Sequence, residues 1–204
     1  MRWWTADWHL GHDRILDYCR RPFVTIEDHD EALEWEYREV VGPDDEVMFL
    51  GDVVMGDEPT RMRGLERLAA LPGRKLLVPG NHDHVHPMHQ AKLELWVPRY
   101  VDAGLTIVGS PGRTMIAGTS GRLSTVSHFP FLPAGGGTVP PDRDFAAWQP
   151  QDRGRDWLIH GHVHDGWRVR DRQINVGVDA WGYRMVPESA VAAIIRRTDR
   201  PAVV

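Results

Sequence analysis

The sequence predicts an α/β fold with a parallel sheet in the first half of the chain and a second, more antiparallel sheet after it. The first observation is the alternation of short apolar runs with segments of helical periodicity between Arg2 and Val78. The second is the change, after Gly104, to short strand-like runs separated by glycine turns. The third is the length of 204 residues, which suits one well-buried domain and is marginal for two. We therefore expect a single domain over residues 1–204.

The first half is predicted to run as a β-α-β-α-β unit. Its strands are the short apolar runs, namely Arg2 to Ala6, Glu46 to Leu50 and Lys75 to Val78. Its helices are the segments whose apolar residues recur at helical spacing, namely Ile15 to Tyr18, Glu27 to Val40 and Thr60 to Leu71. Strands separated by helices pair in parallel, because each connection must cross the sheet.

The second half is predicted to form short strands and a closing helix. The strands are Thr106 to Val108, Thr114 to Ala117, Leu123 to Val126, Trp157 to Ile159, Trp167 to Val169 and Ile174 to Val176. Val186 to Arg196 is predicted as the helix. Between Pro130 and Pro150 lies a stretch rich in glycine and proline that is too long for an ordinary connection. We interpret it as a functional loop or a mobile one.

Composition limits the partners and the compartment. The formal charge of −5 gives no signal for duplex nucleic acid, which usually requires a basic face. No stretch approaches the roughly 20 apolar residues of a membrane span, so we expect no membrane partner. The single cysteine, Cys19, fits a reducing compartment. Because a polar motif begins at Asp7, we expect no cleavable signal, and the composition favours the cytoplasm.

Five short polar motifs carry the chemistry, and each follows a predicted strand. They are Asp7-Trp8-His9, Gly51-Asp52, Gly80-Asn81-His82-Asp83, Ser127-His128 and Gly161-His162-Val163-His164. Strand ends are where α/β sheets usually build their sites. Residues two apart in extended chain point to the same side, so Asp7 with His9, or His162 with His164, can grip one ion. Mixed carboxylate and imidazole ligands suit manganese, iron or zinc rather than calcium.

Each motif alone has an ordinary structural explanation. An Asp-x-His sequence is commonplace, Gly-Asp is a usual turn dipeptide, and a single buried histidine is more often a core residue than a ligand. What favours a metal site is the occurrence of all five, in order, each at the end of an apolar run.

In this order the motifs resemble the calcineurin-like metallophosphoesterase superfamily, with its D-x-H, G-D, G-N-H-D/E, H and G-H-x-H blocks. The match runs from Asp7 to His164, and the segment from Asn175 to Asp179 with Trp181 and Tyr183 is similar to small bacterial and phage members. The resemblance implies a four-layer αββα sandwich of two mixed sheets flanked by helices.

The resemblance also implies roles for individual residues. Two divalent transition-metal ions are implied, with Mn²⁺ first and Fe, Zn²⁺ or Ni²⁺ as alternatives. The first ion would be held by Asp7, His9 and His164, the second by Asn81, His128 and His162, and Asp52 would bridge both. A hydroxide shared by the ions would attack phosphorus, since metal binding lowers the pKa of water. By the same resemblance, His82 is the general acid that protonates the leaving oxygen.

One departure from the family pattern bears on the substrate. Protein phosphatases of the superfamily extend the second block to G-D-x-x-D-R, whereas this chain has Met55 and Gly56 at the last two positions. This weakens a protein-phosphatase interpretation and leaves the orienting partner of His82 open. Weaker candidates for contact with substrate are His12, Arg14 and Arg184. For His12, a solvent-facing position at the start of a helix is an equal alternative.

The sequence therefore predicts a metal-dependent phosphodiesterase acting on small substrates, for which 2′,3′-cyclic nucleotides and aryl diesters are examples. The alternatives are a nuclease or phosphomonoesterase of the same superfamily and a non-catalytic binding scaffold. Scaffolds of this fold lose ligands or the catalytic histidine, whereas this chain keeps all seven ligand candidates and His82. The natural substrate, the native metal and the oligomeric state stay open.

Overall fold

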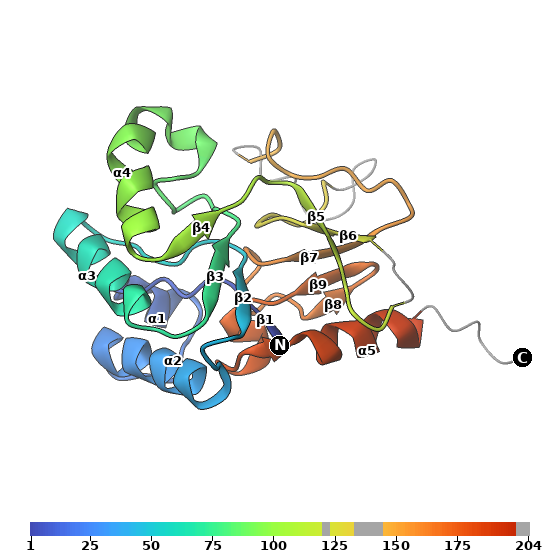
Figure 1. Cartoon of the computed structure of the whole chain (residues 1–204), viewed down its shortest axis with the longest axis horizontal. Coiled ribbons are helices and arrows are strands. Elements are labelled where there is room, and N and C mark those ends of the chain that lie inside the picture. The colour runs from blue at the N-terminus through green and yellow to red at the C-terminus, as the bar shows by residue number, and fades with distance from the viewer. Residues whose placement is uncertain (120–122, 133–144, 199–204) are drawn as a thin grey trace, which may run out of the picture.

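The computed structural model describes residues 1–119, 123–132 and 145–198 (Figure 1). Most of the predicted loop between Pro130 and Pro150, including Gly135 to Gly137, lies outside the described residues.

The first sheet has the strand order β10-β1-β2-β3-β4. Its strands are β1 (Arg2–Thr5), β2 (Glu46–Phe49), β3 (Arg74–Leu77), β4 (Leu105–Ile107) and β10 (Val186–Pro187). The strands β1 to β4 pair in parallel, and β10 pairs antiparallel to β1. The parallel sheet predicted for the first half is thus present, and it gains one antiparallel edge strand from the end of the chain.

The second sheet has the order β5-β6-β7-β9-β8. Its strands are β5 (Gly112–Met115), β6 (Leu123–Val126), β7 (Trp157–His160), β8 (Val169–Arg170) and β9 (Gln173–Asn175). The two outer pairings are antiparallel, while β6, β7 and β9 are parallel. This sheet is more antiparallel than the first, as predicted, and both sheets are mixed.

Four of the helices lie on the side of the first sheet in Figure 1. They are α1 (Arg14–Tyr18), α2 (Ile26–Val40), α3 (Glu58–Ala69) and α4 (Gln90–Asp102). The fifth, α5 (Glu188–Thr198), follows β10, and two short 3₁₀ helices, η1 (Pro87–His89) and η2 (Val178–Trp181), stand before α4 and after β9. Local sequence explains two of the starts: Thr25 and Asp28 form a capping box for α2, and Asp57 caps α3.

Alternation along the strands produces two hydrophobic cores. In β2, Val47 and Phe49 belong to a core shared with the helices, which also contains Leu33 and Leu68. The alternate residues Met48 and Leu50 belong to a second core, as expected for a strand buried on both faces.

The second core joins the two sheets. Trp4 and Val78 meet Trp157, Ile159 and other residues of the second sheet there. The last helix, α5, adds Val191, Ala192 and Ile195 to this core. The architecture is therefore an α/β sandwich of two mixed sheets with helices, as predicted.

Several elements differ from the prediction: the 3₁₀ helices η1 and η2 were not predicted, the strand predicted from Trp167 begins at Val169, and the two largest differences concern α4 and β10. Helix α4 was not predicted; it carries Pro98 in its interior, where proline ordinarily interrupts a helix, but buries Trp96 and Tyr100 one turn apart. The segment predicted as a helix from Val186 begins instead with β10, and the helix starts at Glu188. Two residues are too few to show a strand period, so only the pairing with β1 reveals it.

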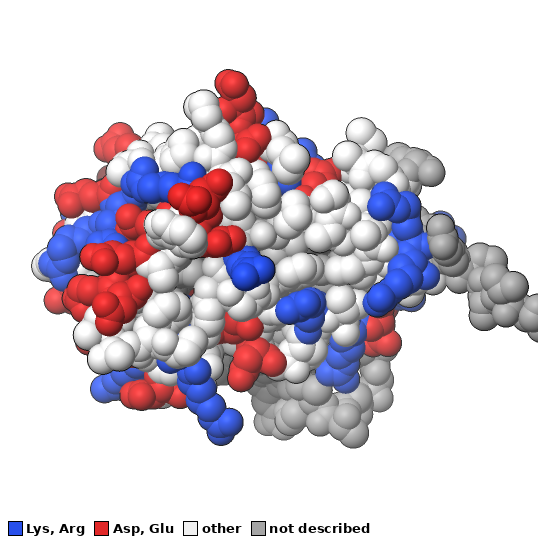
Figure 2. Space-filling model, turned by 90° about the horizontal axis from the view of Figure 1, so that it is seen from below, with Lys and Arg blue, Asp and Glu red and all other residues white. Residues whose placement is uncertain are grey.

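Charge is mixed on the surface. The face in Figure 2 carries basic and acidic side chains side by side, with acidic ones most frequent at the end where the helices lie. Among the described residues, no helix is both long and apolar enough to cross a membrane.

Candidate metal centre

The predicted ligands stand on loops at the carboxyl ends of strands from both sheets. Asp7, Asp52 and Asn81 follow β1, β2 and β3, whereas His128 and His162 follow β6 and β7. The loops meet because the loop after β1 pairs with the loop after β2: the amides of Asp7 and His9 donate to the carbonyls of Gly51 and Asp52 at 3.0 and 2.9 Å. Carboxyl ends of parallel strands share one edge, so ligands distant in sequence converge.

Five of the predicted ligands have left-handed backbone. Their φ angles are 60° at Asp7, 53° at His9, 56° at Asp52, 72° at His162 and 47° at His164. Residues other than glycine rarely adopt this region, and each such residue costs of the order of 1–3 kcal/mol. Strain of this kind persists where the surrounding structure compensates for it, and it concentrates at functional sites.

Gly80 permits the closest approach of two of these loops. A Cβ atom at this position would collide with the Oδ1 atom and the backbone nitrogen of Asp52. The glycine of the Gly-Asn-His-Asp motif is therefore needed for packing against the Asp52 loop.

The predicted ligands of the second ion form a tight group. The Oδ1 atom of Asn81 lies 3.0 Å from His128 Nε2 and 3.1 Å from His162 Nδ1. The two histidine nitrogens are 3.2 Å apart. These separations are close to those of atoms that share one ion with bonds of about 2.1 Å.

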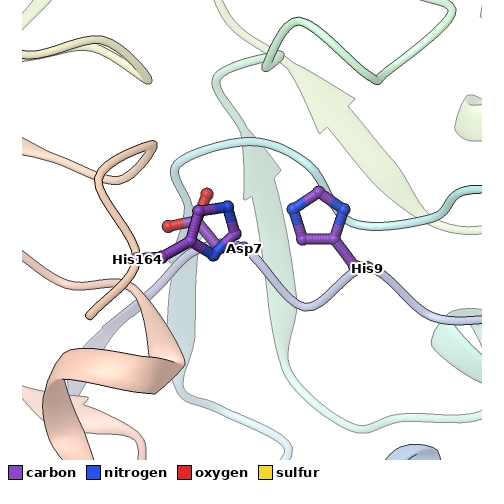
Figure 3. A group of neighbouring side chains, drawn as sticks. All are labelled: Asp7, His9 and His164. Atoms are coloured by element: carbon purple, nitrogen blue, oxygen red, sulfur yellow. The ribbon is translucent and has the colours of Figure 1, made fainter. Parts of the chain in front are cut away.

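The predicted ligands of the first ion converge from two loops (Figure 3). Asp7, His9 and His164 each offer a ligand atom within 4.8 Å of the others. The rings of His9 and His164 are nearly parallel, with centroids 5.2 Å apart. Asp52 lies between the two groups, because its Oδ2 atom is 3.6 Å from His9 Nε2 and 3.4 Å from His128 Nε2. This is the position that a bridging carboxylate requires.

The state of His9 fits a metal ligand. Both of its ring nitrogens are buried and make no hydrogen bond to the residues that the structure describes. Buried polar atoms are normally paired, because an unpaired one costs about 1–3 kcal/mol. Burial holds the pKa of His9 well below its usual value and lowers that of His162 to about 3. Both imidazoles are thus neutral at neutral pH, as ligation of a divalent ion demands.

The charges of the other ligand candidates indicate a site that attracts cations. Burial opposes the protonation of His128, but Asp52 and Asp7 outweigh it and raise its pKa to about 9. For His164, burial is likewise outweighed, by its hydrogen bond to Asp179 and by the charge of Asp7, and the pKa rises to about 11. The buried carboxylates are therefore balanced here by imidazolium, and a divalent ion can take over that role.

His82 and His12 lie beside this cluster. The ring of His82 is 5.4 Å from that of His9, and the ring of His12 is 5.7 Å from it. The backbone amide of His82 donates to Asp52 Oδ1 at 2.8 Å, which ties the histidine to the bridging position. Arg14 and Arg184 are exposed, and neither side chain makes a hydrogen bond or ion pair to another residue that the structure describes.

Asp83 organises the site although sequence reasoning gave it no role. Its buried carboxylate accepts hydrogen bonds from the amides of Asp52, Val53 and Gly80 at 2.8 to 3.1 Å, and from the Tyr100 hydroxyl at 3.2 Å. It thereby joins the loop of Asp52 to the loop of Asn81. Its place at the end of the Gly80-Asn81-His82-Asp83 motif was the sequence feature that could have indicated this role.

Asp179 was missed as well. Its Oδ2 atom lies 2.9 Å from His164 Nδ1, so the carboxylate orients that ring. No local pattern links two residues 15 positions apart, and the contact becomes visible only in the folded chain.

Comparison with known proteins agrees with this geometry. A model of the calcineurin-like phosphoesterase family matches residues 3–166. The Gene 66 protein of Mycobacterium phage L5 is 34% identical over 199 residues, which cover 95% of this chain and 93% of the phage protein. The Gene 66 protein of Mycobacterium phage D29 is 33% identical, with 95% and 94% covered.

A solved structure shows the same fold. A protein of unknown function from Aquifex aeolicus superposes with a TM-score of 0.64 at 22% identity, covering 95% of this chain and 98% of that one. The family match spans all five motifs, and membership implies metal-dependent hydrolysis of phosphate esters. The chain belongs to the calcineurin-like phosphoesterase family.

Proposed function

We propose that this protein is a phosphodiesterase that uses two divalent ions, with Mn²⁺ foremost, to hydrolyse small phosphodiesters such as 2′,3′-cyclic nucleotides. The observation that carries the proposal is the position of Asp52 between two ligand groups, 3.6 Å from His9 Nε2 and 3.4 Å from His128 Nε2. A carboxylate so placed can serve two ions at once. The single cysteine favours a reducing compartment, and we place the reaction in the cytoplasm.

In this proposal the first ion is held by Asp7, His9 and His164, and the second by Asn81, His128 and His162. Bound ions would supply Lewis acidity and lower the pKa of water, which are the contributions of two-metal sites to displacement at phosphorus. The protein contributes a rigid ligand set, because the left-handed loops and the Asp83 hydrogen bonds hold the side chains before substrate arrives.

In this proposal His82 is the general acid that donates a proton to the leaving oxygen. Its side chain is partly exposed beside the cluster and is not part of either ligand group. Burial lowers the pKa of His82, and the Asp52 carboxylate partly offsets this. A phosphate bound nearby would raise the pKa of His82 back towards its ordinary value, since a negative charge favours imidazolium.

The residues after Asp52 favour a diester over a monoester. Gly56 has a φ of 116°, and a Cβ atom there would come within 2.9 Å of Thr60 Cγ2, so the backbone does not suit an arginine. The nearby Arg61 does not replace it, because its guanidinium donates to the carbonyls of Val54, Gly56 and His82. A monoester dianion needs more positive charge than a diester, which carries a single negative charge.

The test is a substrate panel on protein reconstituted with Mn²⁺. We expect kcat/KM to be higher for bis(4-nitrophenyl) phosphate and 2′,3′-cyclic AMP than for 4-nitrophenyl phosphate or a phosphoserine peptide. Asp52→Asn should abolish turnover of all four, because it removes the shared ligand. Higher kcat/KM on the phosphopeptide or the monoester would reverse the proposed substrate class. Full activity of Asp52→Asn would refute the two-ion mechanism itself.

A further inference from the structure

We propose that Arg21 and Asp179 form a buried clamp that directly positions the ligands of the first ion. The Arg21 Nε and Nη2 atoms donate to Asp179 Oδ1 and Oδ2, both at 2.8 Å, so the pair is bidentate. The two side chains are 0% and 1% exposed. Arg21 comes from the segment between α1 and α2, and Asp179 from η2 near the end of the chain.

The clamp holds both segments that carry the first ligand group. On one side, Asp179 Oδ2 lies 2.9 Å from His164 Nδ1. This contact directs the other ring nitrogen of His164 away from the clamp. A carboxylate behind a histidine ligand sets its tautomer and orientation. On the other side, Arg21 donates to the carbonyls of Asp7 and Trp8 at 2.7 and 3.1 Å. One ion pair therefore links the loop of Asp7 and His9 to the loop of His164.

A hydrogen-bond chain extends this hold along the first loop. The guanidinium of Arg21 donates to His29 Nε2 at 2.7 Å, so His29 Nδ1 carries the proton and donates to Asp30 Oδ1 at 2.8 Å. The other oxygen, Asp30 Oδ2, accepts from the Gly11 amide at 3.0 Å. The loop between Asp7 and Gly11 is thus held at both ends by the same network.

Two ligands of the second ion, Asn81 and His128, have separate supports, whereas the amide of the third, His162, donates to the Asp7 carboxylate at 3.0 Å. The Asn81 carbonyl lies 2.7 Å from His89 Nε2, and His128 Nδ1 lies 2.8 Å from the Leu50 carbonyl. Within the described residues, no hydrogen bond joins the clamp to Asn81 or His128. A buried ion pair is weak evidence of stabilisation, since apolar residues often serve as well. Its contacts with two ligand loops indicate positioning instead.

The experiment measures the binding of Mn²⁺ by equilibrium dialysis, with folding checked by circular dichroism and thermal unfolding. The inference rests on the two-ion centre proposed above, and wild-type protein tests that centre first: fewer than two ions per chain would refute the centre. If two ions bind, Asp179→Asn should weaken one of them by about 10–100-fold, the usual effect of losing a partner behind a metal ligand. Asp179→Ala should weaken it more, because asparagine can still accept from His164.

Two single-site backgrounds identify the ion that is lost. In His128→Ala, which impairs the second site, Asp179→Asn should weaken the remaining ion. In His9→Ala, which impairs the first site, Asp179→Asn should change the remaining affinity much less, because the amide of His162 contacts the Asp7 carboxylate but Asn81 and His128 have supports of their own. Tyr37→Phe is the control for general destabilisation, because it removes a hydrogen bond to the Pro72 carbonyl and should leave both affinities unchanged.

Arg21→Lys tests the other half of the clamp with the charge retained. Lysine cannot form the two parallel bonds to Asp179, so the same ion should bind more weakly than in wild type. Equal weakening of both ions, or unchanged binding in Asp179→Asn and Arg21→Lys, would overturn the inference.

Discussion

The side chain of His82 allows proton transfer to be tested separately from metal binding. It adjoins the proposed ligand Asn81, but its contacts to the cluster are made by its backbone amide and by a T-shaped contact between its ring and that of His9. If it is the general acid, its importance depends on how much the leaving oxygen needs a proton. A nitrophenolate leaves without help, whereas a ribose alkoxide does not, and general acid catalysis is typically worth about 10²–10⁴-fold.

We therefore expect His82→Ala to keep both ions and to slow a 2′,3′-cyclic nucleotide far more than an aryl diester. Metal analysis and kcat on the two substrates provide the measurement. Equal losses on both substrates would indicate that His82 binds the phosphate and stabilises its charge. Loss of an ion would mean that the ligand assignment is wrong.

The residues that the sequence revealed and those it concealed differ in a physical way. Asp7, Asp52 and His164 stand in motifs next to apolar runs, so their neighbours in sequence mark them. Arg21 and Asp179, which contact Asp7 and His164, lie 158 positions apart in the chain, and each looks like an ordinary polar residue locally. Only folding brings such supporting residues together, so a single sequence does not reveal them.

The helices and strands also divide into those that the sequence revealed and those that it concealed. The strands β1, β2 and β3 were predictable as short apolar runs, and the helices α2 and α3 from their helical period and clear boundaries, such as the cap at Thr25. Helix α4 was not predicted because Pro98 interrupts its pattern. Packing of Trp96 and Tyr100 into the helix-side core compensates for that interruption, so tertiary contacts decide the structure of this segment.

This account of α4 predicts a stabilising substitution. Pro98 is exposed, and alanine at this position would restore an amide donor to the Glu94 carbonyl. Proline in a helix interior costs about 3 kcal/mol relative to alanine, and its restriction of the unfolded chain offsets about 0.4–1 kcal/mol. We expect Pro98→Ala to raise the free energy of unfolding by about 2 kcal/mol in urea titrations, with metal content unchanged.

Val101→Ala is the matched control on the same helix. Val101 is 54% exposed, so its truncation removes little packing and improves helix propensity only by a few tenths of a kcal/mol. A loss of stability in Pro98→Ala would show that the proline is required for the path of α4 rather than tolerated in it.

Across the whole molecule, the candidate metal centre joins the two sheets. Asp7, Asp52 and Asn81 follow strands of the first sheet, whereas His128 and His162 follow strands of the second. Buried carboxylates and imidazoles of the two sheets face one another at this centre. The carboxylates raise the pKa of His128, and the cationic groups around Asp52 outweigh its burial and lower its pKa. Each ion would therefore bind side chains from both sheets and bridge the sandwich.

This bridging predicts that bound ions stabilise the whole fold. An ion that binds only the folded state adds RT ln(1 + [L]/Kd), about 2.7 kcal/mol at a free concentration of 100 times Kd. Ligands from both sheets are assembled only after the sandwich closes, so the unfolded chain should bind weakly. We expect Mn²⁺ to raise the Tm of metal-free protein in a concentration-dependent way and a chelator to reverse the shift. Asp52→Asn, which removes the shared ligand, should show a much smaller rise. A rise of equal size in Asp52→Asn would mean that the stabilising ions bind elsewhere, and an unchanged Tm in the wild type would show that the centre does not hold the two sheets together.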